Sequence, residues 1–401
     1  MHSVESARAR MQGFVQALGS EPVALHIAAG RTLAEATVAA RGQPPFRSSA
    51  MDGYAVRSAD MGLGRFAVVG QSAAGAAHQG GVGHGEAVRI FTGAPVPQGA
   101  DWVIPQEKTR REGNVVYIDA LANPPQNIRE AGIDFAAGVS LIETGTRLHA
   151  RHVALLASAG IASIGVRVAP RIALLATGTE IATPGTPVGP YQIFDSVTYG
   201  LGAMLESWGG RMASRTACPD DDAEVAAAID AAVRLADLVV IVGGASVGDY
   251  DVVKRALSSR GLEIMVPKVA VRPGQPTWFG AIADKPILGL PGNPAAAFVC
   301  AYLFLRPLID TFLARANSSG CVPAVLEGKV QRSGDFERYW RSVIRVGEDG
   351  RLLVRPFDNQ DSSLVSVFAS SNALIRRLPG QGPCEPGAIV EVVLLNDCGM
   401  L

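Results

Sequence analysis

The stretch from Leu238 to Asp251 limits the fold more than any other part of this 401-residue chain. Five apolar residues, Leu238 to Val242, run directly into the glycine-rich segment GGASVGDYD. A strand without a polar face belongs inside a sheet that is covered on both sides, and glycines at its end let backbone amides approach a ligand closely. The pattern predicts a buried strand followed by a ligand-binding loop, with an ordinary strand-to-helix turn as the alternative.

Asp249 and Asp251 make this loop acidic, and they would repel a bare phosphate. They suit a phosphate or oxyanion that arrives with a divalent cation, because Mg2+ is usually held by one or two carboxylates and by oxygens of the ligand. The same aspartates could instead cap the helix expected after the loop. Their density beside Gly243, Gly244 and Gly248 favours a ligand site.

Strands alternate with amphipathic helices after Pro170. We expect strands at residues 172–176, 212–216, 238–242, 262–266 and 287–290, helices at 196–208, 223–236 and 252–259, and a long helix from Ala295. Such alternation is typical of a mostly parallel, doubly wound sheet with right-handed crossovers. The sequence therefore predicts an α/β domain over residues 169–317.

Short β-type runs separated by Gly and Pro turns occur on both sides of the α/β segment. This pattern predicts a mostly β domain at residues 44–138 and a C-terminal β domain at residues 318–401. The fold class is α/β plus β, in a multidomain chain.

Helical patterns at Val4–Leu18, Thr32–Ala40 and Gly145–Ala159 enclose the first β domain. We therefore expect this β domain to be an insertion within a helical linking domain. The linking domain is discontinuous, and it consists of residues 1–43 and 139–168.

The composition excludes several classes of protein. The net charge is -1 and the sequence has no dense basic run, so we expect no positively charged surface that would attract a nucleic-acid backbone. The cysteines are odd in number and lack a Cys-x-x-Cys pair, which argues against a disulfide framework and a structural zinc site. The longest uncharged apolar run, Ala295 to Leu305, is too short to span a bilayer. We expect a soluble, cytoplasmic protein that binds neither nucleic acid nor membrane.

Polar loops follow several of the predicted strands. Because the carboxyl ends of parallel strands meet at one edge of a sheet, we expect these loops to form one ligand-binding rim. The loops are Thr177-Gly178-Thr179-Glu180, Cys218-Pro219-Asp220-Asp221-Asp222 and Pro291-Gly292-Asn293-Pro294, together with the loop after Val242. Helix capping explains at least one aspartate of the second loop equally well, and a simple turn could explain the third.

Lys268 and Arg272 place two cations before the segment Pro273-Gly274-Gln275-Pro276. Together with the rim they could offset the charge of a phosphate or a molybdate-type oxyanion, although either could be a surface residue. His149 and His152 have the spacing of a helical metal pair, but a solvated helix face is the better interpretation.

Seven sequence blocks, spread over nearly the whole chain, narrow the choice of function. They are PPFRSSAMDGYAV from Pro44, IFTGAPVPQGADWVIPQE from Ile90, NIREAGIDFAAG from Asn127, TGTEI from Thr177, GGASVGDYDVVK from Gly243, KVAVRPGQP from Lys268 and GLPGNPAAA from Gly289. In this order they resemble the molybdopterin molybdenumtransferase family, the molybdenum insertases that include the E domain of gephyrin.

The resemblance implies four domains, an elongated homodimer, and an active site that combines the α/β domain of one subunit with the inserted β domain of the other. It implies transfer of molybdenum from molybdate to adenylylated molybdopterin, with Mg2+ as the cofactor and release of AMP. Other proteins of molybdenum-cofactor biosynthesis and molybdoenzyme chaperones are further candidate partners.

The resemblance also assigns roles to individual residues. The implied catalytic residues are Asp52, Thr92, Asp134, Glu180, Asp220 and Asp251. Of these, Glu180, Asp220 and Asp251 would hold the cation. The implied substrate-binding residues are Gly243, Gly244, Ser246, Asp249, Lys268, Arg272, Pro291, Gly292, Asn293, Arg338 and Ser362.

Three positions depart from the family pattern. The family usually has aspartate where Thr179 stands, asparagine at Val197 and lysine at Gln275. These changes bear on Mg2+ affinity and on pterin orientation. The alternatives to an active insertase are therefore a diverged, non-catalytic molybdopterin carrier or scaffold, and a pyrophosphatase that acts on another nucleotide.

Overall fold

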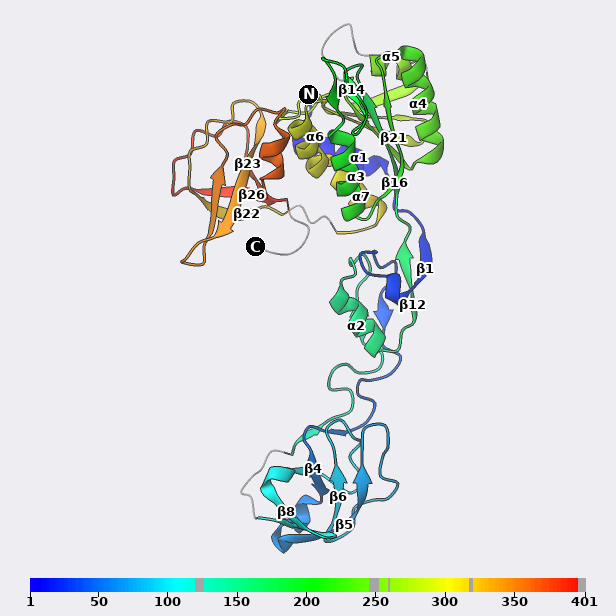
Figure 1. Ribbon diagram of the computed structural model, residues 1–401, viewed down its shortest axis with the longest axis vertical. Helices are drawn as coiled ribbons and strands as arrows, with labels where there is room; N and C mark the ends of the chain where they lie inside the picture. The colour runs from blue at the N-terminus through cyan, green and yellow to red at the C-terminus, as the bar shows by residue number, and fades with distance from the viewer. Residues whose placement is uncertain (120–125, 245–251, 259, 317–319, 396–401) are drawn as a thin grey trace.

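The computed structural model describes residues 1–119, 126–244, 252–258, 260–316 and 320–395 (Figure 1). The molecule is elongated. The inserted β unit lies at one end, the linking unit lies in the middle, and the α/β and C-terminal β units lie side by side at the other end (Figure 1).

A six-stranded sheet in the described part of the chain forms the centre of the α/β unit, in the order β16-β13-β17-β21-β20-β18. Its strands are β13 (Arg171–Thr177), β16 (Arg211–Cys218), β17 (Leu238–Val242), β18 (Leu262–Val266), β20 (Trp278–Ile282) and β21 (Lys285–Leu290). Strands β16, β13, β17 and β21 are parallel, whereas β20 is antiparallel to both of its neighbours. The sheet is therefore mixed, because it includes the antiparallel strand β20, which was not predicted from the sequence.

Helices cover both faces of this sheet (Figure 1). They are α1 (Val4–Phe14), α3 (Val197–Ser207), α4 (Asp222–Leu235), α5 (Val252–Ser258), α6 (Pro294–Cys300), the π-helix η4 (Ala301–Leu305) and α7 (Arg306–Phe312). Along β17, Val240 and Val242 pack with α1, α3, α6 and α7, whereas Val239 and Ile241 pack with α4 and α5. Because each fully buried aliphatic side chain contributes about 1.5–3 kcal/mol, a strand that is apolar on both faces is stable only between two helical layers.

The continuous helix Pro294–Phe312 is long and apolar enough to cross a membrane. However, 83% of its most apolar window is buried inside the protein. Ala295, Ala296 and Ala297, near its N-terminal end, are all buried. This segment is therefore explained as a core helix of the α/β unit.

The linking unit consists of segments from both sides of the insertion. Strand β1 (Ser20–Ala24) pairs with β12 (Ser163–Arg167), and β2 (Thr37–Val38) pairs with β11 (Ser140–Ile142). The first β unit therefore lies, in the sequence, between the two segments that form the linking unit.

The expected helical character of the linking unit is only partly correct. Helix α2 (Ala150–Ser158) and the short 3-10 helix η1 (Leu25–Ile27) are present, but the predicted helix over Thr32–Ala40 is wrong. Within that segment, Thr32 forms a β-bridge with Arg147 and Leu33 forms one with Val166. The apolar periodicity there reflects burial against strands, because tertiary pairing overrides a weak local preference.

The inserted unit is a six-stranded sheet, within the described residues, in the order β7-β4-β6-β5-β9-β8. Its strands are β4 (Gly53–Val56), β5 (Arg65–Ser72), β6 (Glu86–Ile90), β7 (Trp102–Pro105), β8 (Thr109–Glu112) and β9 (Val115–Ile118), with the 3-10 helices η2 (Ser58–Leu63) and η3 (Gln106–Lys108). The chain enters and leaves beside the pair β3 (Ser48–Ser49) and β10 (Ile128–Arg129). Within its described residues, this unit consists mainly of β-strands with two 3-10 helices.

The C-terminal β unit closes into a barrel. In the described part of the chain each of the five strands β23, β24, β22, β26 and β25 pairs with the next, and β25 pairs back with β23. These strands are β22 (Val322–Leu326), β23 (Glu337–Val346), β24 (Leu352–Pro356), β25 (Ala373–Arg377) and β26 (Ile389–Leu394). Strand β19 (Val271–Arg272) joins the barrel from the α/β unit, and α8 (Val365–Ala369) packs near α6. The residue limits given above for the four domains stay predictions.

We expect Gly289→Ala to destabilise the protein by about 1–3 kcal/mol, because overpacking a buried site costs that much. A Cβ at Gly289, on β21, would overlap the indole ring of the buried Trp278. Gly13→Ala is the matched control, since its Cβ would meet no atom within 4 Å on the surface of α1. It should raise stability by about 0.5–1 kcal/mol. Urea unfolding of both variants measures the difference, and equal midpoints would contradict the packing argument.

Candidate functional site

A cavity of about 610 Å³ lies at the carboxyl ends of β13, β16, β17 and β21. Segments that follow each of these four parallel strands line it. The predicted residues among its lining are Gly178, Glu180, Asp220, Gly243, Gly244, Pro291, Gly292 and Asn293. Residues far apart in the sequence thus share one site, because parallel strands deliver their loops to the same edge of the sheet.

The two glycines after β17 are required by packing. Gly243 and Gly244 have φ angles of +92° and +61°, values that residues with a Cβ rarely adopt. A Cβ at Gly243 would lie 2.6 Å from the carbonyl oxygen of Thr177, and one at Gly244 would overlap the side chain of Val253. The glycines therefore bring the end of β17 close to β13 and α5, where their backbone lines the cavity.

Glu180 and Asp220, two of the three predicted metal ligands, line the same cavity with exposed side chains. The neighbouring Asp221 has another role, because its carboxylate caps α4 by accepting hydrogen bonds from the amides of Ala223 at 2.9 Å and Glu224 at 3.0 Å. Capping therefore explains Asp221 and leaves Asp220 at the cavity. Within the described ranges, no group of three or more His, Cys, Asp or Glu side chains is arranged to hold a metal ion.

A second cavity, of about 290 Å³, contains three residues that the family resemblance had linked to an oxyanion. They are Arg272, Arg338 and Ser362. The guanidinium of Arg272 lies 4.2 Å from the centroid of the Phe336 ring, and Nε of Arg338 donates to the carbonyl oxygen of Ser333 at 3.0 Å. Both arginines are thus oriented by contacts that leave their charges at the cavity.

One hydrogen bond connects the two cavities. The side-chain amide of Asn293, which lines the larger cavity, donates to the hydroxyl of Ser362 in the smaller one at 2.9 Å. The amide of Ala295 donates to the carbonyl oxygen of Ser362 at 2.9 Å. The start of α6 therefore fixes the loop of the C-terminal barrel beside the α/β rim.

The structure adds site residues that sequence reasoning did not assign. Asp195 is a buried carboxylate in the larger cavity, and Ile193 and Phe194, on strand β15 (Ile193–Phe194), form an apolar wall beside it. Asp195 accepts hydrogen bonds from the amide and the hydroxyl of Thr198. Its position before a helix resembles ordinary capping, so the sequence carried little signal. The hydroxyl of Thr177 is buried at the cavity and lacks a partner among the described residues.

The three departures from the family pattern have different structural surroundings. Thr179 accepts a hydrogen bond from the amide of Asp220 at 3.4 Å, so its hydroxyl contacts the acidic loop. Val197 is 6% exposed and belongs to the main apolar core of the α/β unit. The side chain of Gln275 contacts the sulfur of Met1.

Other predicted site residues lie elsewhere. Lys268 does not line either cavity in the described structure, and its carbonyl oxygen accepts a hydrogen bond from the amide of His2. Ser246, Asp249 and Asp251 fall outside the described residues, so their placement stays a prediction.

Asp52, Thr92 and Asp134 belong to the far end of the same chain. Oδ1 of Asp52 accepts hydrogen bonds from the amide and the hydroxyl of Thr92, both at 2.8 Å. Asp134 is exposed at the neck of the insertion, where its amide donates to the carbonyl oxygen of Gln43 at 3.0 Å. Within one chain, the inserted unit is separated from the α/β rim by the whole linking unit (Figure 1). A single chain therefore does not bring all the predicted catalytic residues together.

The thiol beneath the acidic loop is unsuited to catalysis or metal binding. Burial, together with the charges of Glu224 and Asp220, raises the pKa of Cys218 to about 11. Because the thiolate is the reactive form, Cys218 stays protonated and inert at neutral pH.

Three protein-family models match successive parts of this chain. The family model described as the MoeA N-terminal region (domain I and II) matches residues 2–160. A probable molybdopterin binding domain matches residues 173–311, and the MoeA C-terminal region (domain IV) matches residues 323–395. These three regions follow the same order as the structural units described above.

Relatives extend over nearly the whole chain. Molybdopterin molybdenumtransferase from Haemophilus influenzae is 34% identical over 94% of both chains. The enzyme of that name from Bacillus subtilis is 33% identical and covers 98% of this chain and 94% of its own. The crystal structure of a molybdopterin biosynthesis MoeA protein from Pyrococcus horikosii has a TM-score of 0.84 at 31% identity, covering 98% of this chain and 99% of that one.

The fold and the rim therefore define a transferase of molybdenum cofactor biosynthesis that carries a molybdopterin-binding domain. The chain belongs to the molybdopterin molybdenumtransferase (MoeA) family. The predicted resemblance is confirmed.

We expect Thr92→Val to raise the pKa of Asp52. The amide of Thr92 holds that pKa below its ordinary value of 3.8, and the Thr92 hydroxyl lowers it further. Because the folded pKa is depressed, the ionised carboxylate contributes stability above pH 3.8, and this contribution is lost as the pH falls through the folded pKa. Removing the hydroxyl should move that loss to higher pH.

Carbon-13 NMR titration of the Asp52 carboxyl measures this shift. Thr92→Ser keeps both donors and should titrate like the wild type. An unchanged Asp52 titration in Thr92→Val would contradict the assigned cause.

Proposed function

We propose that this chain inserts molybdenum from molybdate into adenylylated molybdopterin, with Mg2+-dependent cleavage of the adenylate link and release of AMP. One observation carries the proposal: an acidic, glycine-lined cavity lies next to a smaller cavity with two arginines, and the Asn293–Ser362 hydrogen bond joins them. Such a pair can hold a phosphorylated ligand and a separate oxyanion close together.

The larger cavity suits the adenylylated pterin. Its volume of about 610 Å³ lies within the usual range for small-molecule sites. Ile193 and Phe194 offer apolar surface to a flat ring system, whereas Gly243 and Gly244 leave room for phosphate oxygens beside the backbone. The pterin would therefore lie against β15, with its phosphates toward the end of β17.

The smaller cavity suits molybdate. Molybdate is a tetrahedral dianion, and Arg272 and Arg338 supply two positive charges in guanidinium groups suited to binding an oxyanion. The Ser362 hydroxyl adds a neutral polar group at the boundary between the cavities. Molybdate would thus bind next to the reacting end of the pterin.

Glu180 and Asp220 fit a Mg2+ ion by the chemistry of their donors. Mg2+ is typically bound by one or two carboxylates plus phosphate oxygens of the substrate, and both side chains are exposed at the cavity. When bound, the ion would offset the negative charge of the phosphoanhydride. The two carboxylates would hold and orient it, and Thr179 would position Asp220 through its amide.

A second copy of the chain would complete the active site. Asp52 and Thr92 form a hydrogen-bonded pair on the inserted unit, which lies far from the rim of its own chain (Figure 1). In a homodimer, the inserted unit of one copy would present this pair, with Asp134 at its base, to the α/β rim of the other. We further propose a cytoplasmic protein that exchanges its product with other cofactor-biosynthesis proteins or molybdoenzyme chaperones.

A carrier that binds molybdopterin without turnover is the second candidate. Val197 favours it, because an apolar, core-packed side chain stands where the family usually places a polar amide at the cavity. Incubation of the purified protein with adenylylated molybdopterin, molybdate and Mg2+ separates the two functions. The insertase releases AMP, whereas the carrier binds the pterin without releasing AMP.

We expect Asp220→Asn to slow AMP release about 100-fold or more, because it removes a charge that would hold the cation. Asp221→Asn is the matched control, since asparagine caps a helix as well as aspartate does. It should retain activity and stability. Single-turnover AMP release measures both variants. Equal rates for Asp220→Asn and the wild type would defeat the assignment.

We expect Arg338→Gln to raise the KM for molybdate about tenfold or more, because a hydrogen bond to a charged group contributes about 1.5–3 kcal/mol. Arg332→Gln is the control: this arginine is exposed and does not line the cavity in the described structure. AMP release at varied molybdate concentration gives the KM. An unchanged value in Arg338→Gln, with normal pterin binding, would place molybdate elsewhere.

A further inference from the structure

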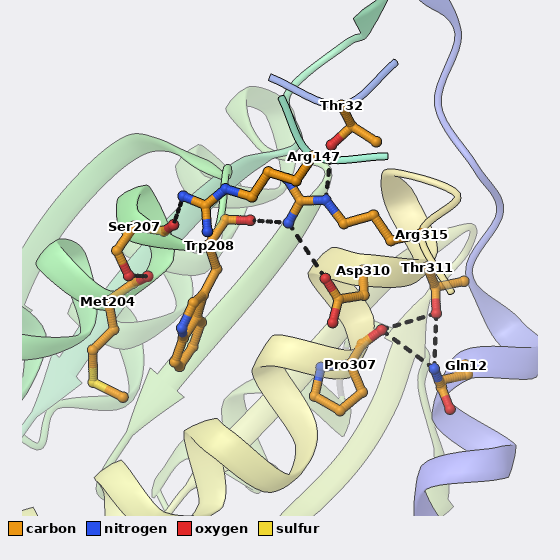
Figure 2. A network of polar contacts seen from close by, with 10 residues as sticks. All are labelled: Gln12, Thr32, Arg147, Met204, Ser207, Trp208, Pro307, Asp310, Thr311 and Arg315. Carbon is orange, nitrogen blue, oxygen red and sulfur yellow. Dashed lines mark hydrogen bonds and ion pairs between the residues drawn. The ribbon is translucent and has the colours of Figure 1, made fainter. Parts of the chain in front are cut away.

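A third cavity, of about 350 Å³, lies at the junction of the linking unit and the α/β unit. Thr146 and Arg147 of the linking unit line one side, and Arg306 and Arg315, on and after α7, line the other. Figure 2 shows how Arg147 and Arg315 meet beside Trp208 at the end of α3. The cavity is separate in its lining from both cavities of the proposed active site.

This cavity is strongly positive. Three guanidinium groups, those of Arg147, Arg306 and Arg315, surround it, with one described carboxylate, that of Asp310, in its lining. Arg315 is 10% exposed on its side chain, and it forms an ion pair with Asp310 at 3.4 Å. Burial lowers the pKa of Arg315, and the charges of Arg147 and Arg306 lower it further, against the opposing effect of Asp310.

Several donors at this junction already have partners. Nη2 of Arg147 donates to the carbonyl oxygen of Ser207 at 2.6 Å, and Nη1 of Arg315 donates to that of Trp208 at 2.6 Å (Figure 2). Nε of Arg315 donates to the hydroxyl of Thr32 at 2.8 Å (Figure 2). These bonds cap the C-terminal end of α3 and hold the two guanidinium planes in place.

Other donors on the same two side chains have no partner. Nε of Arg147 and Nη2 of Arg315 are buried and form no hydrogen bond among the described residues. Gly209 leaves room for the second atom, because a Cβ there would lie 2.7 Å from Nη2 of Arg315. Both atoms are enclosed by protein, so the cavity is faced by other parts of the two guanidinium groups.

We propose that the cavity binds a small tetrahedral oxyanion of the phosphate class. Such an anion would accept hydrogen bonds from the guanidinium groups that line the cavity, those of Arg147, Arg306 and Arg315, and would offset their positive charge. The Thr146 side chain also lines the cavity. Because Arg147 belongs to one unit and Arg306 and Arg315 to the other, the anion fastens the linking unit to the α/β unit. Occupancy then controls how firmly the inserted unit is held in position.

Thermal unfolding with inorganic phosphate tests the site, with chloride at matched ionic strength as the reference. The Tm of the wild type should rise with phosphate concentration. Arg147→Gln should weaken the fitted phosphate affinity about tenfold or more, since it removes a positive charge together with the guanidinium N–H donors. Arg151→Gln removes an exposed charge on α2, outside the cavity lining, and should respond to phosphate like the wild type.

A crystal of the wild type soaked in selenate locates the anion independently of any variant, because selenium gives an anomalous signal. The expected result is a peak between Arg147 and Arg315. A peak that appears only at Arg272 and Arg338, or a phosphate response that is identical in Arg147→Gln and the wild type, would overturn the proposal. If Arg147→Gln does not fold, Arg147→Lys, which keeps the charge but loses the planar guanidinium, replaces it in the same titration, and a phosphate affinity equal to that of the wild type would count against the proposal.

Discussion

Parallel pairing of β16, β13, β17 and β21 is the constraint on which the rest of the structure depends. Parallel strands all end at the same edge of the sheet, so each loop that follows one of them arrives at the same place. The sheet keeps this arrangement because helices bury both of its faces, and a shift of one strand by one residue would move its side chains to the wrong face. The convergence of Glu180, Asp220 and Gly243 follows from that pairing.

The elongated shape distributes the site residues among units. The rim cavity lies in the α/β unit, the two cavity arginines come from β19 and the barrel strand β23, and Asp52 is held by Thr92 on the inserted unit. Neighbouring units are joined by specific contacts: Asn293 bonds to Ser362, and Arg315 bonds to Thr32. Chemistry at the rim thus depends on how firmly the units are fixed to one another. The hydrogen bonds of Arg147 and Arg315 help to fix the linking unit to the α/β unit.

Much of the α/β unit could be predicted, because its strands are uniformly apolar and its helices have clear ends. The predicted strand Leu238–Val242 matches β17 in both limits. Strand β20 was missed because the sheet there turns antiparallel, with a short connection and no intervening helix to mark it. The helix predicted over Thr32–Ala40 failed because those residues pair with segments more than 100 positions away. Barrel closure between β23 and β25 also left no local pattern.

The sequence by itself determined the family, the doubly wound sheet and the acidic and glycine-rich character of the rim. Each of these follows from the types of residues in short, continuous stretches of the chain. Only the tertiary structure decided which residues meet. It separated Asp220 at the cavity from Asp221 at a helix cap, added Asp195 and Phe194, and put Arg338 beside Arg272 but left Lys268 outside. Such distinctions depend on side-chain direction and on contacts between distant segments, and a local sequence pattern contains neither.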